Sequence, residues 1–408
     1  LMLALPRAVS AQCADNTQGT DFYLMFLRNY IPESGAKELS LVAVGDSETV
    51  VYIYVNGSLL MTGPIGAAGP PGMRKFVMPT PQTIVYPSNG CVVQNRGLHV
   101  TATNNISLYA MNDIDYSYDG SIVLPTSALD TDYVVQAYAQ WIGNMGATGS
   151  EVGFVAAEDS TVLTMTLPCA IYNSNDVMVA DSGTEHTVTL QQGQTYQMHT
   201  RRLASFSGMR VTSNGKPFAC FQGTGCANVP LGDPDYLDCG ACDHLYEQTL
   251  PLKFWGRHFV VVPTAQHTGG DIALVTSSAD SCVVTLDQAT VATLAAGETI
   301  ELDISAGMAK TIHTSQPATV GLYLKGEACA GGPGDPAAVM LPPVEQGIQQ
   351  VRFTAMSSAN TLYHYVNLVT RTVDTADMRL DGEPLDTTWN TLPSGYSWLQ
   401  LPVRPGTH

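Results

Sequence analysis

One strand pattern recurs at three places along the chain, and this repeat limits the possible folds more than any other feature. GLHVTATNNISLYAMN (97–112) aligns with GMRVTSNGKPFACFQG (208–223). GMAKTIHTSQPATVGLYLKG (307–326) follows the same pattern with a small insertion. Each copy predicts a strand after a glycine, a short polar turn and a second strand. A chain built from such copies is expected to form several similar units rather than one large core.

A second element follows each copy and marks where one unit ends and the next begins. Its three occurrences, each with a Leu-Pro pair, are 122–136, 249–262 and 339–353. The resulting prediction is an N-terminal segment followed by four units, with the last unit stopping halfway through the pattern. The predicted boundaries are 1–12, 13–125, 126–251, 252–342 and 343–408.

The local composition of these units predicts an all-β fold. Stretches rich in Val, Thr, Tyr and Ile alternate with Asn-Gly or Asp-Gly pairs at 56–57, 214–215 and 381–382, which are strong hairpin signals. No long stretch has helical periodicity with caps at both ends. We therefore expect a tandem array of β-sandwich-like units, the last of them incomplete.

Charge and the N-terminal sequence bear on where the protein acts. Charged residues make up only 13% of the chain, against about 25% in an average soluble protein, and the net charge is −18. This charge argues against nucleic acid and anionic membranes as partners.

Residues 1–12 resemble the end of a secretory signal with cleavage after Ala11, although an ordinary N-terminal strand is the alternative. No stretch has the roughly 18 continuous apolar residues that would span a bilayer.

The cysteines favour an oxidising, extracellular compartment. Nine cysteines are many for a cytosolic chain without a metal pattern. Cys239 and Cys242 form a Cys-x-x-Cys, which raises the alternatives of a redox pair or, with Cys220 and Cys226, a zinc site. A haem anchor is excluded because Asp243, and not His, follows Cys242. Disulfides that close one long loop are the favoured interpretation.

The segment around these cysteines resembles the IgGFc-binding protein N-terminal domain family. The resemblance is strongest in CANVPLGDPDYLDCGACDHLYEQTLPLKFWGRHFVVVP (226–263) and extends more weakly from about residue 20 to the end. The positions that fill the family pattern are Cys226, Asn228, Val229, Pro230, Cys242, Asp243, His244, Glu247, Gln248, Pro251, Trp255 and Gly256. The resemblance implies a pairing of Cys226 with Cys242 and an extracellular protein associated with mucus or cell surfaces. It does not assign immunoglobulin binding to any residue.

Cys220 and Cys239 are where the sequence departs from the family pattern. Cys220 and Cys239 are candidates for a second, local pair, and Cys282 and Cys329 for a third. Cys13, Cys91 and Cys169 then remain. An odd cysteine in a secreted chain suggests a bond between chains, with a buried free thiol as the alternative.

Catalytic and metal-binding patterns are sparse. Asp243, His244 and Glu247 are residue types that can form an acid/base or metal set, but no motif places a nucleophile or second carboxylate beside them, so a structural role is favoured. Gln248 is a candidate only as a residue of the family motif. We expect no enzymatic activity and no cofactor.

Calcium is a weaker alternative at two acidic loops, whose candidate ligands are Asp113, Asp115, Asp119, Asp233, Asp235 and Asp238. Asn56 and Asn105 lie in Asn-x-Ser sequons and are candidate glycosylation sites.

Two functions fit these observations. The first is a secreted, non-enzymatic binding or adhesion module whose partner is an extracellular protein or glycan. The second is a structural subunit of an extracellular filament, sheath or matrix that assembles with copies of itself through β-edges. A glycosidase would rest only on the abundance of carboxylates, and nothing in the sequence supports it.

Overall fold

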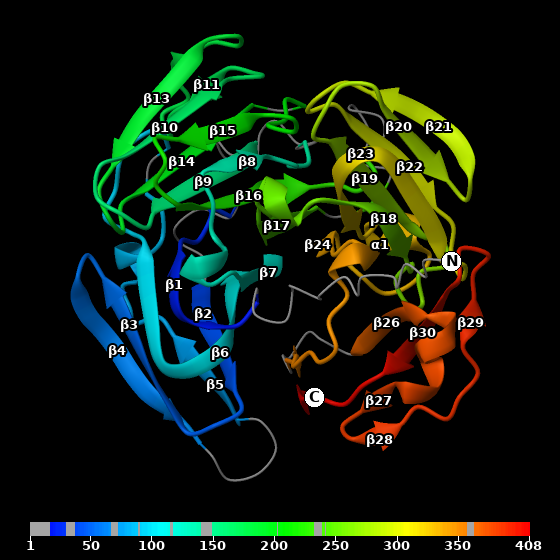
Figure 1. Cartoon of the computed structure of the whole chain (residues 1–408). Helices are drawn as coiled ribbons and strands as arrows, with labels where there is room; N and C mark the ends of the chain where they lie inside the picture. Colours follow the sequence, from blue (N-terminus) through cyan, green and yellow to red (C-terminus); the bar gives the residue numbers. More distant parts are fainter. Residues whose placement is uncertain are drawn as a thin grey trace, which may run out of the picture.

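The computed structural model describes residues 17–29, 37–66, 72–88, 90–114, 117–139, 149–201, 203–231, 239–240, 242–356 and 363–408. The predicted all-β fold is confirmed: the chain forms several sheets and only one four-residue α-helix in these residues. Following the chain in Figure 1, four groups of strands succeed one another around a common centre, coloured blue to cyan, green, yellow and orange to red. No helix in the described residues is long and apolar enough to cross a membrane.

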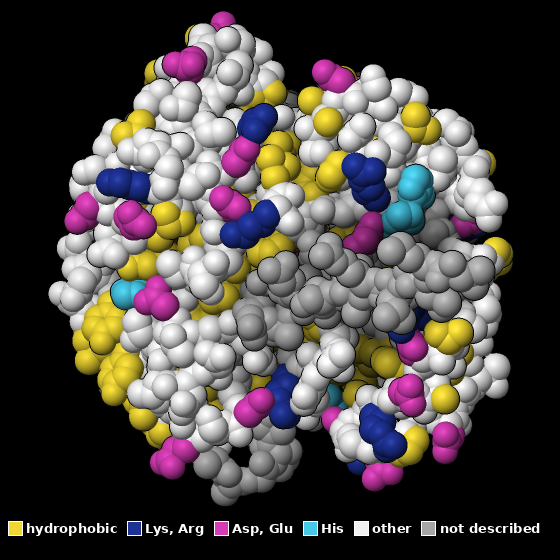
Figure 2. Space-filling view, in the orientation of Figure 1, with side chains coloured by type: hydrophobic (Ala, Val, Ile, Leu, Met, Phe, Trp, Pro, Cys, Tyr) yellow, Lys and Arg dark blue, Asp and Glu magenta, His cyan; other side chains and the backbone are white. Residues whose placement is uncertain are grey.

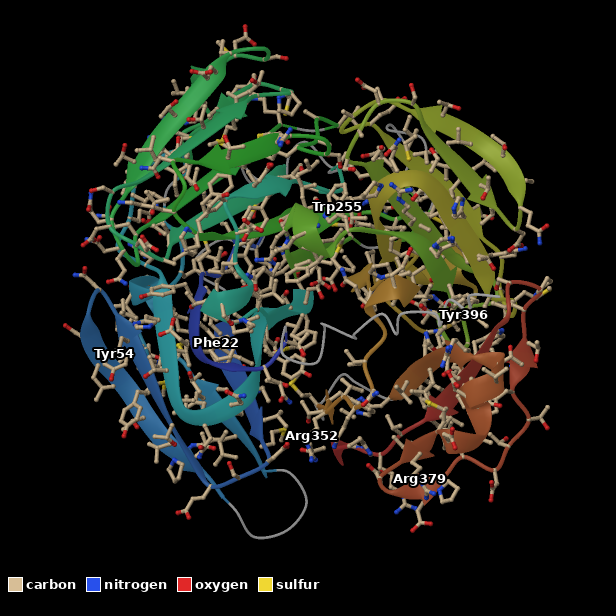
Figure 3. All side chains as sticks on the ribbon, viewed as in Figure 1. Phe22, Tyr54, Trp255, Arg352, Arg379 and Tyr396 are labelled. Atoms are coloured by element: carbon tan, nitrogen blue, oxygen red, sulfur yellow. A yellow bond between two sulfur atoms is a disulfide. The ribbon has the colours of Figure 1, made fainter. Side chains whose placement is uncertain are left out.

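The first unit is a seven-stranded sheet that folds over its own core. Its strands are β1 (Gly19–Leu24), β2 (Lys37–Gly45), β3 (Thr49–Val55), β4 (Ser58–Ile65), β5 (Gly72–Val77), β6 (Leu98–Ile114) and β7 (Ser117–Val123). The first half of β6 pairs with β1 and β3, and its second half pairs with β2 and β7. One long strand therefore belongs to both layers of the unit, and buried side chains such as Phe22 fill the space between them (Figure 3).

The second unit has the same plan, but its long strand is divided in two. Its strands are β8 (Asp132–Val134), β9 (Ser150–Ala156), β10 (Thr161–Thr166), β11 (Ile171–Tyr172), β12 (Met178–Ala180), β13 (Glu185–Leu190), β14 (Thr195–His199), β15 (Arg210–Ser213), β16 (Phe218–Ala227) and β17 (Asp243–Gln248). They form two sheets, β13-β10-β15-β8 and β12-β11-β14-β9-β16-β17. Strands β15 and β16 together replace β6, and β11 and β12 have no counterpart in the first unit.

The third unit returns to a single seven-stranded sheet. Its strands are β18 (Gly256–Val261), β19 (Asp271–Ser277), β20 (Cys282–Leu286), β21 (Ala289–Leu294), β22 (Thr299–Ile304), β23 (Lys310–Tyr323) and β24 (Ala338–Leu341), and helix α1 spans Glu327–Ala330. Its central strand β23 pairs with β18 and β20 in its first half and with β19 and β24 in its second half. The repeated sequence thus corresponds to the shared central strand of each unit.

The last part of the chain forms smaller sheets. They are β25 (Thr354–Ala355) with β31 (Gly406–Thr407), β26 (Tyr365–Arg371) with β30 (Tyr396–Pro402) and β29 (Asn390–Thr391), and β27 (Arg379–Leu380) with β28 (Glu383–Pro384). Leu392, Tyr396 and Trp398 pack on the third unit, against Val260 and Val262. Every sheet draws its strands from one of the predicted units, but the exact unit boundaries stay a prediction.

Short 3-10 helices connect the units at the predicted Leu-Pro positions. They are η2 (Thr126–Ala128), η3 (Leu252–Phe254) and η4 (Val344–Gln346), and a proline precedes each of them. Proline suits this place because its fixed φ angle is compatible with the first turn of a helix and its missing N–H is not needed there. Each connector leads from the last strand of one unit to the next.

Gly223 shows how closely strands pack where units meet, and it gives the first prediction. A Cβ atom at this position would lie 2.0 Å from the backbone oxygen of Leu245 and 3.0 Å from Cδ1 of Leu27. We expect Gly223→Ala to lower the free energy of unfolding by about 1–3 kcal/mol, as overpacking does. Gly66→Ala is the matched control because a Cβ there meets nothing within 4 Å. Equal melting temperatures of the two variants in calorimetry would contradict this packing.

Candidate functional site

The strand that carries the family-like motif, β17, lies at the centre of the molecule beside β7 and next to β24 (Figure 1). These three strands are the last strands of the first, second and third units. We call them together the central seam. The motif residues Asp243, His244, Glu247 and Gln248 are all buried there, with at most 8% of their surface exposed.

Side chains, and not a backbone ladder, join β7 to β17. Backbone N–H groups of each strand donate to side-chain oxygens of the other. These bonds are Tyr118 N to Asp243 Oδ1 (3.0 Å), Tyr246 N to Asp119 Oδ2 (2.8 Å), Gln248 N to Ser121 Oγ (2.7 Å) and Leu124 N to Gln248 Oε1 (2.7 Å). The motif residues therefore satisfy backbone donors that would otherwise be buried without a partner.

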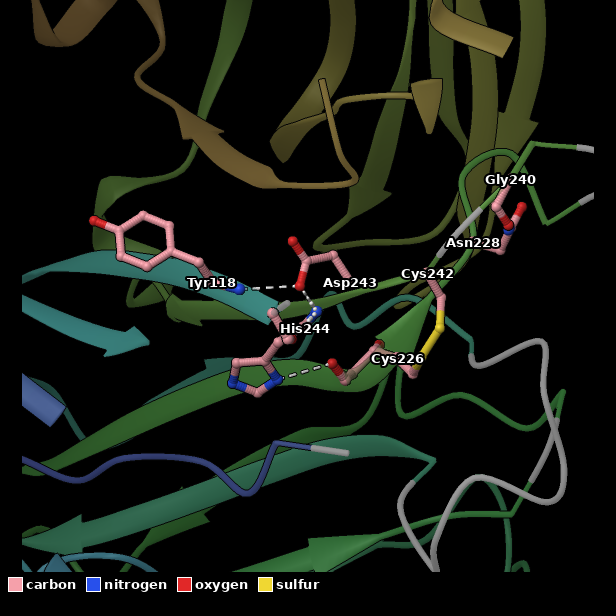
Figure 4. Close-up of a disulfide and its surroundings, with 9 residues drawn as sticks. Tyr118, Cys226, Asn228, Gly240, Cys242, Asp243 and His244 are labelled. Carbon is pink, nitrogen blue, oxygen red and sulfur yellow. Dashed lines mark hydrogen bonds between the residues drawn. A yellow bond between two sulfur atoms is a disulfide. The ribbon is translucent and has the colours of Figure 1, made fainter. Parts of the chain in front are cut away.

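The uncharged ring of His244 forms hydrogen bonds with residues on two other strands. Its Nδ1 lies 3.1 Å from the carbonyl oxygen of Thr224, and its Nε2 lies 3.1 Å from Nδ2 of Asn112. A carbonyl needs a donor and an amide nitrogen needs an acceptor, which assigns the proton to Nδ1. Burial lowers the pKa of His244 to about 4, so the ring is uncharged at neutral pH. Figure 4 shows the ring below Asp243, close to the Cys226–Cys242 disulfide.

Burial shifts the carboxyl groups of the central seam toward their neutral form. Burial raises the pKa of Asp243 to about 7 and the pKa of Glu247 to about 8. Burial and the nearby Glu247 raise the pKa of Asp119 well above its usual range. Backbone N–H and hydroxyl donors act in the opposite direction, because they favour a charged carboxylate, but they do not outweigh burial.

The third unit joins the central seam through Glu247. Its carboxyl group accepts hydrogen bonds from Ser121 Oγ (3.0 Å) in the first unit and from the backbone N–H of Met340 in β24. Gln136 extends the link between units, because its Nε2 donates to Leu274 O (3.2 Å) and Thr276 Oγ1 (2.8 Å). One motif side chain thus contacts two neighbouring units. The favoured structural role of the motif agrees with this geometry.

The structure contains the Cys226–Cys242 disulfide that the resemblance implies. The other two expected pairs are wrong: Cys239 pairs with Cys329, and Cys220 and Cys282 are free. Cys220 and Cys282 lie inside the hydrophobic cores of the second and third units. Cys239 is instead bonded to Cys329 in helix α1 of the third unit.

These pairings exclude both the zinc site and the redox pair that the sequence left open. Cys239 and Cys242 each bond to a different distant cysteine, so they are neither a dithiol pair nor thiolate ligands of zinc. Cys91 and Cys169 are free and partly buried, and burial raises the pKa of each thiol to about 11. Cys13 lies outside the described residues.

Of the calcium candidates, only Asp113 and Asp119 lie within the described residues, as do both glycosylation candidates. Asp119 accepts backbone hydrogen bonds at both carboxylate oxygens, from Gly120 and Tyr246. Asp113 lies on β6, and the other candidates, Asp115, Asp233, Asp235 and Asp238, are outside the described residues. Within the described part, no group of three or more His, Cys, Asp or Glu side chains is placed to hold a metal ion. Asn56 and Asn105 are exposed, and their glycosylation stays a prediction.

An open groove on the first unit was not predicted from the sequence. It has a volume of about 550 Å³ and is lined by Val55, Thr83, Ile84, Ser88, Gln94, Asn95 and Arg96. Gln94 forms an isolated β-bridge with Thr195, and Asn95 Oδ1 accepts from Gln194 Nε2 (3.0 Å), so the second unit supports one wall. Such a junction of two units has no local sequence signature.

The face shown in Figure 2 agrees with the low charge of the chain. Acidic and basic side chains are scattered over it among uncharged atoms.

Trp255, another residue of the family pattern, is 8% exposed and donates from Nε1 to Leu250 O (3.2 Å) next to connector η3 (Figure 3). The family-like residues are thus concentrated at junctions between units.

The role of Gln248 gives a second prediction. Gln248→Ala removes the acceptor of the buried Leu124 N–H, and such a loss costs about 1–3 kcal/mol. We expect a lower melting temperature and faster hydrogen exchange at Leu124. Gln350→Ala, on an exposed segment, is the control and should change neither quantity. Unchanged exchange at Leu124 in Gln248→Ala would rule out this contact.

The disulfides give a third prediction. Non-reducing peptide mapping should find Cys226 linked to Cys242 and Cys239 linked to Cys329, with Cys220 and Cys282 alkylated only after unfolding. The two bonds span 16 and 90 residues. In the loop-entropy model, removal of the longer link should therefore destabilise the protein by about 1.5 kcal/mol more. A peptide joining Cys220 to Cys239 would contradict the assignment.

Comparison with known proteins identifies the family to which the motif strand is similar. The family model described as IgGFc binding protein matches residues 119–408. The human IgGFc-binding protein is 27% identical over 179 residues, which is 42% of this chain but only 3% of the human protein. The chain therefore spans a small part of that relative's length. Because the family model matches most of the chain, including the whole central motif, the chain belongs to the IgGFc-binding protein family.

Proposed function

We propose that the chain is a secreted, non-enzymatic binding module that holds an extracellular protein or glycan on the outer surface of a rigid array of β-sandwich units. The observation that carries this proposal is the placement of the motif. Asp243, His244 and Glu247 form contacts between units in the interior, where a substrate does not reach them. The exposed groove on the first unit is the candidate contact surface.

Further observations support the extracellular location and the absence of catalysis. The Cys226–Cys242 and Cys239–Cys329 bonds are typical of an oxidising compartment. Both ring nitrogens of His244 already have partners, which leaves no position for proton transfer to a ligand. The name of the human relative states Fc binding for that protein, and immunoglobulin Fc is therefore the first partner to test here.

A binding measurement tests the proposal and gives a fourth prediction. The chain, secreted from cultured cells, is immobilised and exposed to immunoglobulin Fc and to a mucin-type glycoprotein. We expect saturable binding of one of them, weakened about tenfold, or about 1.4 kcal/mol, by Ile84→Asp in the groove. Val373→Asp is the control because Val373 is 81% exposed on the last unit, away from the groove. Failure to bind either partner, or equal effects of both substitutions, would contradict the proposal.

A structural subunit of a filament or matrix is the second candidate. The observation that favours it is the exposed apolar end of the sheet in the second unit, where Val177, Met178 and Val179 are 57%, 53% and 44% exposed at edge strand β12. An exposed apolar edge favours pairing with another strand. Sedimentation of the purified chain distinguishes the two: oligomers that are lost in Met178→Lys would favour the subunit, and a monomer at all concentrations would favour the binding module.

A further inference from the structure

The three carboxyl groups of the central seam lack a basic partner. Asp119, Asp243 and Glu247 are 7%, 6% and 8% exposed. Their hydrogen-bond donors are backbone N–H groups and serine hydroxyls, as described above, and within the described residues none of the three forms an ion pair with Lys or Arg. Buried carboxylates are normally paired, so an unpaired set in one interface is unusual.

The charged groups that act on these three carboxyl groups are themselves acidic within the described residues. Asp119 faces Glu247 and Asp243, and Asp243 also faces Asp335 of the third unit. Further titratable groups near them are Glu38, which is ion-paired with Lys75, and Asp113 and Tyr118 from the first unit, His244 and Tyr246 from β17, and Tyr323 from β23. Ionisation of the seam therefore places like charges together without compensation.

A buried acceptor next to Glu247 indicates that the protonated form is accommodated. Gln136 Oε1 has no hydrogen-bond partner, although its residue is 1% exposed. Gln136 and Glu247 line the same small cavity, whose volume of about 10 Å³ is close to that of a single water probe. A protonated Glu247 can donate toward this acceptor through one water in the shared cavity, whereas an ionised Glu247 cannot.

We propose that Asp119, Asp243 and Glu247 form a proton-operated latch that holds the first unit on the second when protonated and releases it when ionised. The release occurs between β7 and β17, because Asp119 and the donors Tyr118 and Ser121 belong to β7. On the other side of β17, the Cys239–Cys329 bond keeps the second and third units linked. The latch acts on contacts between units and does not depend on which ligand the groove binds.

The direction of the pH effect follows from protonation linkage. Each of these groups has a pKa that burial raises above its value in the opened chain. Their stabilising contribution is therefore complete below the usual carboxyl range near pH 4. It is lost as the pH rises through about 7 for Asp243 and about 8 for Glu247. Each titrating group changes the opening equilibrium by up to about tenfold per pH unit in this window.

The experiment compares the full chain with Glu247→Gln, which keeps the size and acceptor of the side chain but cannot ionise. Calorimetry and small-angle X-ray scattering are measured from pH 5 to pH 9. We expect the melting temperature of the wild type to fall and its radius of gyration to increase progressively as the pH rises from 5 to about 8. Both changes should be smaller in Glu247→Gln. Glu383→Gln, at an exposed position in β28, is the matched control and should follow the wild type.

An infrared measurement keeps the proposal testable if the substitution disturbs folding. Wild-type protein at pH 6 should show the carbonyl stretch of protonated carboxylic acids, and this band should disappear between pH 7 and pH 9. An absent band at pH 6 would overturn the latch. The same conclusion would follow if folded Glu247→Gln showed the pH profile of the wild type, or if the wild type became more stable toward pH 9.

Discussion

The arrangement of the units depends on the contact between β7 and β17. In this contact, backbone N–H groups donate to side-chain oxygens instead of to backbone carbonyls. Both strands are the last strands of their sheets, and a sheet edge presents unpaired N–H groups. Burial of two such edges against each other without partners would cost about 1–3 kcal/mol for each unmet donor. Asp, Ser and Gln side chains reach across the gap and accept these donors, so the edges are buried without forming a continuous sheet.

The residue types of the motif follow from this task. A side chain that caps a backbone N–H must carry an oxygen acceptor, and the distance between two sheets needs side chains of different lengths. Asp243 is short and serves Tyr118, whereas Gln248 is longer and reaches Leu124. Carboxyl groups add a cost of burial, and this burial raises their pKa values and so favours the protonated form. The motif is therefore an interface signature, although its composition resembles that of an acid/base site.

The sequence predicted the strands and their repetition well because both depend on local patterns. The alternation in TVVYIYVNG and the turn at Asn56-Gly57 directly specify β3 and β4. The pairing of Cys239 with Cys329 could not be predicted in this way, because it joins two units that are neighbours only after folding. The same reason applies to the groove at Gln94, one wall of which depends on contacts with β14, and to the partners of His244, which come from β6 and β16. Residues that act between units carry no periodic signal within either unit.

Hydrophobic contacts complement the polar central seam and decide which units move together. Tyr246 and Phe221 of the second unit belong to the same buried cluster as Phe22 of the first. A further cluster joins Tyr138 and Leu245 to Leu274 of the third unit. Large apolar interfaces of this kind oppose relative motion of domains, whereas small ones permit it. The last unit packs on two small clusters, with Leu392, Tyr396 and Trp398 against the third unit and Met356 against the first. The first three units are therefore joined by apolar contacts as well as by the central seam, and ionisation of the carboxyl groups acts against the apolar contact between the first two units.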